Sequence, residues 1–328
     1  MFMTVKLTDV ARKAGVSPTT VSRVINNYGY LSKKTINKVH AAMAELNYQP
    51  NALARSLQGK KSQLIGLVFP SVSNPFFGEL IEKLESKLFE KGYKSILCDS
   101  ANNSIKEREY LNMLIANQVD GIITGSHNLG IKEYENINLP IVSFDRYLAD
   151  SVPIVSSDNY RGGVLATELL ITHGGKNIAI FTGTNKSPSP TNNRLKGYLD
   201  TINKSKLQPK VFNFPDDYSP TVKSIEISRI LKSEMIDSIF CTDDLTALLL
   251  FDEAEKLGKS IPEDLKIIGY DGTNFIKSYF PKLTTIVQPI DEYVSLLINL
   301  LIQRIDGKNE GLANQYQLPV TVFYGTSV

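Results

Sequence analysis

Short apolar runs alternate with amphipathic stretches from residue 64 onward. Each run suits a strand that is buried on both faces of a sheet. The intervening stretches, such as Phe77–Lys91 and Ile105–Gln118, carry apolar positions at helical spacing. This strand-helix rhythm predicts parallel α/β sheets. The apolar runs are LIGLVFP, KSILCDS, DGIITGS, PIVSFD, NIAIFTG, SIFCTDD and LKIIGYDG.

Two lobes with a cleft between them follow from this pattern. The α/β region is longer than one ordinary domain, so two lobes fit better than a single core. The segments Val155–Asp158 and Val287–Pro289 are candidate crossovers, after which a helix over Glu292–Asp306 returns to the first lobe. Such folds bind their ligands beyond the carboxyl ends of the strands, in the interlobe cleft.

Before residue 50, the apolar positions predict three short helices. Thr8 is a candidate cap for the first helix, and Gly15 supplies the turn that follows it. Ser17 suits the cap of a second helix, with Pro18 at the favoured first position. A third amphipathic helix begins at Ser32. Two short helices joined by a tight turn form a helix-turn-helix, whose second helix enters the DNA major groove.

The net charge of +2 conceals a strong asymmetry along the chain. Residues 1–61 hold ten lysines and arginines against two acidic residues, which gives a net charge of +8, and the remaining residues carry −6. A basic terminal segment is typical of a DNA-binding head, because cationic side chains replace the counterions that condense on phosphates. A solvated run of charges is the alternative interpretation.

Composition and motifs argue against several other classes of protein. Residues 1–15 lack the apolar region of a signal peptide, and no later stretch is apolar enough to cross a bilayer, so we expect a cytoplasmic protein without membrane contact. Cys98 and Cys241 lie in apolar runs and are interpreted as buried thiols. Dinucleotide-loop, phosphate-loop and GxSxG motifs are absent, and the histidines lack metal-ligand spacing. We therefore predict that the protein is not an enzyme and that it has neither a cofactor nor a metal site.

The motifs DVARKAGVSPTTVSRVIN and AAMAELNYQPNALARSLQGKK resemble the lactose/galactose repressor family of bacterial transcriptional regulators. The α/β region also resembles periplasmic sugar-binding proteins. The resemblance implies a small all-α helix-turn-helix DNA-binding domain (1–49), a hinge helix with linker (50–61), and a two-lobed α/β periplasmic-binding-protein-like (type I) effector-binding and dimerisation domain (62–328). Lobe 1 is expected at about 62–156 and 290–318, and lobe 2 at about 157–289 and 319–328.

The family resemblance assigns contacts to double-stranded operator DNA along the second helix. Pro18-Thr19 stands where family members place larger polar side chains, so the contact positions transfer but their base preferences do not. The implied base-reading residues are Pro18, Thr19, Ser22 and Arg23, the phosphate-contacting residues are Ser17, Thr20 and Asn26, and Leu7 is an accessory base contact.

The segment from residue 51 to 58 is too short for a stable isolated helix, so we expect it to order only on DNA. The resemblance implies that it folds in the minor groove beside its copy from a second subunit. Leu57 is then the residue that wedges between base pairs. Packing of Leu57 on its own core is the alternative. The implied hinge contacts are Asn51, Ala54, Arg55 and Leu57.

Several polar side chains stand just past the predicted strand ends: Asp145, Arg194, Asp243, Asp271 and Gln288. They suit a polyhydroxyl ligand, because carboxylates accept from paired hydroxyls and arginine donates in a planar fork. Aromatic faces can cover the C–H surface of a sugar. Asp244 is interpreted as a helix cap. The alternatives are that Asp243 provides the cap, that Phe76 belongs to the core, and that Asp145 forms a surface pair with Arg146. The family resemblance places in the effector cleft Ser73, Asn74, Phe76, Phe77, Asp145, Arg194, Asp243, Asp271 and Gln288.

The segment GYDGTNFIKSYFPKLTTIVQPI most resembles sucrose-operon repressors of Gram-positive bacteria. That resemblance implies a repressor of a sugar-utilisation operon, with sucrose, fructose or a sugar phosphate as effector. A global carbon regulator that binds a phosphocarrier protein on its first lobe is one alternative. A sugar-binding protein that does not bind DNA is another.

A homodimer that holds two heads on a palindromic operator is the expected assembly. We expect effector binding to move the hinge attachments near Lys60 apart and thereby to lower operator affinity. The sequence ends at Val328 without a heptad helix, so we expect no tetramerising tail.

Overall fold

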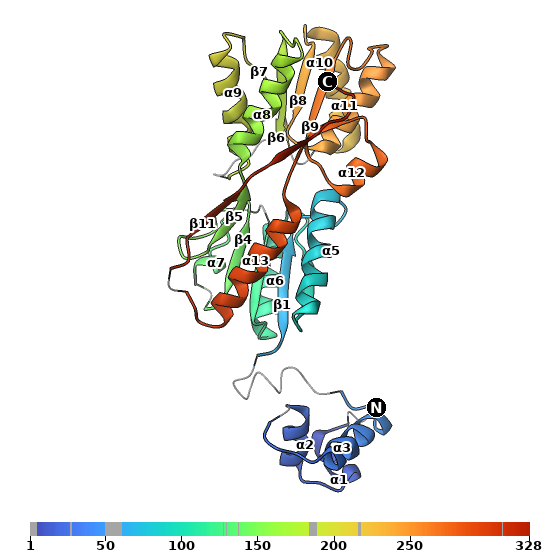
Figure 1. Cartoon of the computed structure of the whole chain (residues 1–328), viewed down its shortest axis with the longest axis vertical. Coiled ribbons are helices and arrows are strands. Elements are labelled where there is room, and N and C mark those ends of the chain that lie inside the picture. Colours follow the sequence, from blue (N-terminus) through green and yellow to red (C-terminus); the bar gives the residue numbers. More distant parts are fainter. Residues whose placement is uncertain are drawn as a thin grey trace. The chain divides into compact units, whose positions relative to one another are not determined.

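The computed structural model describes residues 5–26, 28–49, 61–126, 128, 130–136, 138–183, 189–215, 218–309 and 311–328 (Figure 1). The chain divides into two compact units, Met1–Ser62 and Gln63–Val328. None of the helices in these ranges is long and apolar enough to span a lipid bilayer.

The first unit contains three helices, α1 (Leu7–Ala14), α2 (Pro18–Ile25) and α3 (Lys33–Glu45). Their contact faces form a small core around Val10, Val21 and Val39. The hydroxyls of the predicted cap Ser17 and of Ser32, which directly precedes α3, accept from the backbone N–H groups of the first turns of α2 and α3. These local bonds end the preceding loops and start the helices.

The prediction that Thr8 caps the first helix is wrong. The helix begins at Leu7, so Thr8 lies within its first turn. The Lys6 N–H donates to Asp9 Oδ2 at 2.9 Å, so the carboxylate of Asp9 satisfies a backbone donor at the start of the helix. Gly15 ends the helix with φ at 66°, a left-handed conformation that costs glycine little.

Lobe 1 is built on a parallel sheet with the strand order β11-β5-β4-β3-β1-β2. Its apolar runs are continuous because helices cover both faces of the sheet. The helices α5 and α13 lie side by side on one face, and α6 packs against β1 and β2 (Figure 1). The strands are β1 (Leu64–Phe69), β2 (Lys94–Asp99), β3 (Gly121–Thr124), β4 (Ile141–Phe144), β5 (Ile154–Ser157) and β11 (Gln315–Leu318), and the helices are α5 (Pro75–Glu90), α6 (Ser104–Ala116), α7 (Glu133–Asn136) and α13 (Ile290–Ile305).

Lobe 2 repeats this plan with the strand order β12-β10-β9-β8-β6-β7. All its neighbouring strands are parallel except β10 and β12, which pair antiparallel. Separate apolar clusters lie under α8 with α9 and under α10 with α11. The strands are β6 (Ile178–Gly183), β7 (Lys210–Phe214), β8 (Ser238–Cys241), β9 (Lys266–Asp271), β10 (Thr284–Val287) and β12 (Thr321–Phe323), and the helices are α8 (Asn159–Thr172), α9 (Asn192–Lys204), α10 (Pro220–Ser233), α11 (Asp244–Lys256) and α12 (Asn274–Tyr279).

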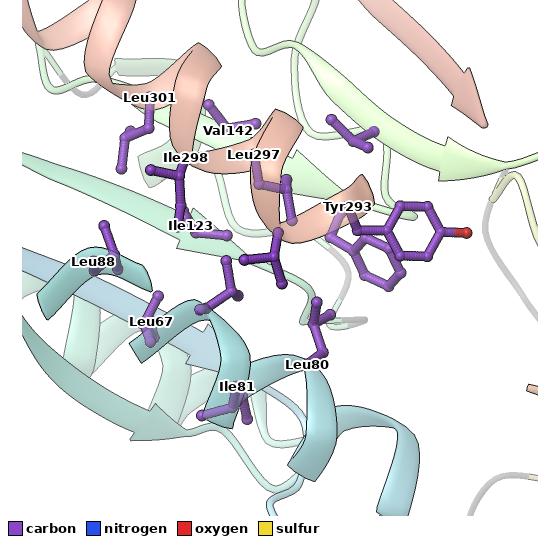
Figure 2. Packing of buried hydrophobic residues seen from close by; sticks show 14 of the residues in the cluster. Leu67, Leu80, Ile81, Leu88, Ile123, Val142, Tyr293, Leu297, Ile298 and Leu301 are labelled. Atoms are coloured by element: carbon purple, nitrogen blue, oxygen red, sulfur yellow. The ribbon is translucent and has the colours of Figure 1, made fainter. Parts of the chain in front are cut away.

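The chain passes between the lobes three times. It leaves lobe 1 after β5, returns between β10 and α13, and crosses again between β11 and β12, which Figure 1 shows in dark red. The returning helix α13 anchors the second passage, because Tyr293, Leu297 and Leu301 pack with residues of α5 and the sheet (Figure 2). The sheets therefore belong to one body in which the strand ends of both lobes face a shared cleft.

Candidate functional site

The outer face of α2 carries the predicted DNA-reading residues. Ser17, Pro18, Thr19 and Arg23 are exposed. Thr20, Ser22 and Asn26 are half-buried, and Leu7 is half-buried against the head core. Because the buried valines Val21 and Val24 occupy the opposite side of α2, the polar groups lie on the side of the helix that faces solvent.

A turn after α2 holds the side chain of Arg23. Its Nε donates to the carbonyl oxygen of Tyr28 at 3.3 Å. Gly29 has φ at 73°, and a Cβ at this position would lie 2.4 Å from Arg23 Nη2. Asn26 ends the helix, and its Nδ2 donates to the Ser22 carbonyl oxygen at 2.7 Å. The hinge predictions for Asn51, Ala54, Arg55 and Leu57 lie outside the described residues.

A cavity of about 320 Å³ lies between the two lobes. The prediction that Ser73 lines it is wrong; the Ser73 hydroxyl bonds with that of Ser71 at 2.9 Å, and Ser71 lines the cavity. The other predicted effector residues do line it: Asn74, Phe76, Phe77, Asp145, Arg194, Asp243, Asp271 and Gln288.

Arg194 on α9 is the buried cation of this cleft, with 7% of its surface exposed. Its Nε donates to Asn159 Oδ1 at 2.7 Å, and its Nη1 donates to the Thr242 carbonyl oxygen at 2.7 Å. The guanidinium lies 3.6 Å from the centroid of the Tyr270 ring. These contacts fix the guanidinium plane before any ligand enters, which lowers the entropic cost of binding.

Asp145 follows β4 and faces the cavity with only 3% of its surface exposed. The Asn159 amide donates to its carboxylate at 3.4 Å. Burial raises the pKa of Asp145 to about 6, and the Arg194 charge opposes that shift. Arg146 is also buried, so the two residues are not a surface ion pair.

Asp271 is the last residue of β9, and a side chain of the crossover segment holds its carboxyl group. Gln288 Nε2 donates to its Oδ1 at 2.7 Å, and the Tyr293 hydroxyl donates to Gln288 Oε1 at 3.1 Å. Desolvation and the neighbouring Asp244 carboxyl raise the pKa of Asp271 well above its ordinary value. Asp145 and Asp271 both have positive φ, at 52° and 129°. Strain of this kind persists where the surrounding structure imposes it, often at ligand sites.

The assignment of Asp244 as the helix cap is wrong. Asp243 caps α11, because its Oδ1 accepts from the Thr246 N–H at 2.7 Å. Asp244 is buried and accepts from the Gly272 N–H at 2.7 Å and from the Thr285 hydroxyl at 2.6 Å. Burial raises the pKa of Asp244 to about 7. Asp243 thus caps the helix and also lines the cavity, whereas Asp244 supports the loop that carries Asp271.

The two predicted aromatic residues differ in what they offer a ligand. Phe76 is 5% exposed and belongs to the lobe 1 core, where its ring lies 5.8 Å from that of Phe144. Phe77 is half-buried and packs edge-on against Phe76. Phe77 therefore offers more surface to a sugar, while Phe76 supports it from the core.

Sequence reasoning missed several residues that line the cavity. Asn102 follows β2, so the rule that polar residues follow strand ends could have found it. Lys223 lies on α10, and its Nζ is 3.4 Å from Thr246 Oγ1. No strand-end pattern reports a lysine on a helix. The missed lining residues are Pro70, Ser71, Asn102, Phe144, Thr182, Gly183, Thr191, Lys223, Thr242 and Leu245.

The buried-thiol interpretation of Cys98 and Cys241 is confirmed, since neither side chain is accessible. Burial raises the pKa of the Cys98 thiol to about 11. Among the described residues, no group of His, Cys, Asp and Glu has an arrangement that could hold a metal ion.

Two family descriptions match this arrangement. Residues 6–51 match the bacterial regulatory proteins of the lacI family, and residues 167–328 match the periplasmic binding protein-like domain. The sucrose operon repressor of Pediococcus pentosaceus is 54% identical over 320 residues, which is 98% of both chains. The chain belongs to the lacI family. It is a DNA-binding transcriptional repressor and not an enzyme, as the sequence predicted.

Solved structures of lacI-family proteins share its fold. The lac repressor dimer bound to operator and the anti-inducer ONPF matches with a TM-score of 0.84 and 27% identity over 98% of each chain. The periplasmic binding protein/LacI transcriptional regulator from Alkaliphilus metalliredigens QYMF, complexed with D-xylulofuranose, matches with a TM-score of 0.73 and 34% identity. That match covers 81% of this chain and 99% of the other. The predicted fold class, a helix-turn-helix domain plus a two-lobed α/β domain, is confirmed.

Proposed function

We propose that this lacI-family repressor is a cytoplasmic homodimer that controls sucrose-utilisation genes and responds to a sugar or sugar phosphate in the interlobe cleft. The observation that carries the effector assignment is the cavity itself, where aspartates, a preoriented arginine and an aromatic face converge. This donor and acceptor set fits a polyhydroxyl ligand. The similarity to sucrose operon repressors over nearly the whole chain supports the choice of genes.

The proposed DNA interface combines two contacts. The exposed face of α2, with Pro18, Thr19, Ser22 and Arg23, reads base edges in the major groove. The hinge residues Asn51, Ala54, Arg55 and Leu57 bind in the minor groove, where Leu57 wedges between base pairs. Replacing Leu57 by alanine is expected to weaken specific operator binding while sugar binding is unchanged. Equal operator affinity of the variant and the parent protein would remove the wedge role.

A second copy of this chain is the proposed partner for the exposed apolar side chains at the edges of the lobes. Phe89, Leu97 and Ile115 are 65%, 47% and 43% exposed on α5, β2 and α6, and β2 is an edge strand. On lobe 2, Ile225 and Tyr279 are exposed on α10 and α12. Exposed apolar side chains on neighbouring elements are typical of interaction surfaces. A dimer by light scattering supports this assembly, and a monomer or tetramer contradicts it.

Effector control is proposed to act through the hinges. A ligand that contacts both lobes favours one lobe arrangement and changes the separation of the hinge attachments. Coupling of about 1 to 3 kcal/mol changes operator affinity roughly 5- to 150-fold.

The test is operator binding at fixed salt, with DNA from upstream of the gene itself and of neighbouring sugar genes. The protein is titrated with sucrose, fructose and their phosphates. Loss of binding with one compound supports the proposal and identifies the effector. Tight binding that no sugar changes favours the alternative, a carbon regulator whose DNA affinity depends on a phosphocarrier protein. Repeating the titration with and without that partner separates the two.

A further inference from the structure

Outside the effector cavity, a carboxylate of lobe 1 is hydrogen-bonded to a residue of lobe 2. Glu79 Oε2 accepts from the backbone N–H of Asn274 at 2.8 Å, and Glu79 Oε1 accepts from Asn274 Nδ2 at 2.7 Å. The two residues are 195 positions apart in the sequence. Figure 1 shows their helices, α5 and α12, adjacent at the junction of the lobes. One side chain thus makes two bonds to the same residue of the other lobe.

Lys83 keeps the Glu79 carboxylate in position. Its Nζ lies 3.5 Å from Glu79 Oε1 and 2.7 Å from Asp291 Oδ1. The Glu79 side chain is 13% exposed and that of Lys83 is 27% exposed, so water screens these charges only partly. Hydrogen bonds to an ionised acceptor are stronger than neutral ones. The bonds from Glu79 to Asn274 are therefore stronger than bonds between neutral groups would be.

The contact joins two of the segments that line the effector cavity. Glu79 lies on α5, one turn after the cavity residues Asn74 and Phe76. Asn274 lies three residues after the cavity residue Asp271, whose backbone is strained. Neither Glu79 nor Asn274 lines the cavity. Moving the lobes apart at this edge would break both bonds and displace the Asp271 loop from α5.

We infer that Glu79, Lys83 and Asn274 form an interlobe latch that sets the sensitivity of the repressor to its effector without contacting it. This role rests on the proposed function, because it requires a ligand in the cleft. Glu79 is a positioning residue for Asp271. The latch favours the lobe arrangement in which residues of both lobes surround one cavity, so its loss weakens binding of any ligand that contacts both lobes.

The variants E79A, N274A and the double variant of the full-length protein test this inference, with E85A as the matched control. Glu85 is an exposed glutamate on the same helix. Operator release is titrated with sucrose, fructose and their phosphates. We expect E79A to raise the concentration of the active compound needed for release roughly 5-fold or more. N274A has a smaller effect because the backbone bond remains, and the double variant resembles E79A. Parental sensitivity in E79A, or additive effects in the double variant, overturns the inference.

Hydrogen exchange of the ligand-free protein separates this inference from the proposed function. The Asn274 amide is protected by Glu79, so exchange of a peptide over residues 272–280 is expected to accelerate in E79A and to remain unchanged in E85A. If the parent protein responds to none of the compounds, the proposed function fails and exchange alone decides whether the latch exists. Equal exchange in the parent, E79A and E85A overturns it.

Discussion

The DNA-reading face of the head and the effector cleft of the lobes are built in opposite ways. The reading face comes from one helix and its cap. Its exposed residues Ser17, Thr19 and Arg23 lie within a span of seven residues. The cleft draws Asn74, Asp145 and Gln288 from distant parts of the sequence, and it buries its central charges. A surface built from one helix can change without loss of stability, whereas a buried charged cleft binds ligand and supports the fold with the same residues.

The largest effect is expected from removing the buried cation of the cleft. Arg194→Met leaves Asp145 and Asp271 without their counter-charge and removes the bonds to Asn159 and Thr242. Loss of one partner of a buried charge network costs about 3 to 5 kcal/mol of unfolding free energy. Urea unfolding measures it, and Lys196→Met on the exposed side of α9 is the control. Equal stability of the two variants would show that the cleft charges do not support the fold.

A smaller effect, and only on DNA binding, is expected at the head. Arg23→Ala removes an exposed guanidinium that we predict to read a base edge, so it lowers operator affinity by about 1 to 3 kcal/mol and relaxes specificity at one base position. Unfolding free energy changes by less than about 0.5 kcal/mol. Binding to operators substituted at single positions measures the effect. An equal loss on operator and random DNA would mean that Arg23 contacts only phosphates.

At the effector cleft, both stability and sugar affinity are expected to depend on pH through Asp145. The pKa of Asp145 is about 6 in the fold, above its ordinary value, so the folded chain binds a proton that the unfolded chain releases. The contribution of Asp145 to the free energy of unfolding is therefore fully present below pH ~4 and is lost as the pH rises through about 6. An ionised carboxylate accepts from a sugar hydroxyl more strongly than a protonated carboxyl does, so sugar affinity is expected to rise up to about tenfold per pH unit below pH ~6.

Calorimetric titration with the active sugar from pH 5 to 8 measures the affinity, and urea unfolding over the same range measures the stability. Asp145→Asn is the control, because an amide does not titrate in this range. A parent protein whose sugar affinity has the same pH dependence as that of the variant would exclude Asp145 as an acceptor.

The smallest effect is expected at Lys223, which was missed because it lies on a helix. It is half-buried beside Thr246, so its ammonium is partly screened by water. Lys223→Gln is expected to lower affinity for a sugar phosphate roughly 2- to 5-fold relative to the neutral sugar. Lys232→Gln at the exposed end of α10 is the matched control. An unchanged preference between the two ligands would place the phosphate away from α10.

Local chemistry accounts for the features that sequence reasoning predicted. Ser17 and Pro18 define the start of α2 because a hydroxyl cap and a fixed φ act within one turn. Asp145 and Asp271 were identified because parallel strands end at a common edge. The exchange of roles between Asp243 and Asp244 could not be predicted from their order, since it depends on which carboxylate reaches Thr246 and which reaches Gly272.

The sequence by itself determined the helix-turn-helix, the alternating α/β lobes and the strand-end residues of the cleft, because each depends on periodicity or on neighbours within a few positions. Only the tertiary structure decided how the charges share the cleft: burial raises the pKa of Asp145, and the contacts of Arg194 come from α8, from β9 and from the loop after β8. It also joined Glu79 to Asn274. Long-range packing sets desolvation and contact distance, and neither is encoded in the spacing of residues along a chain.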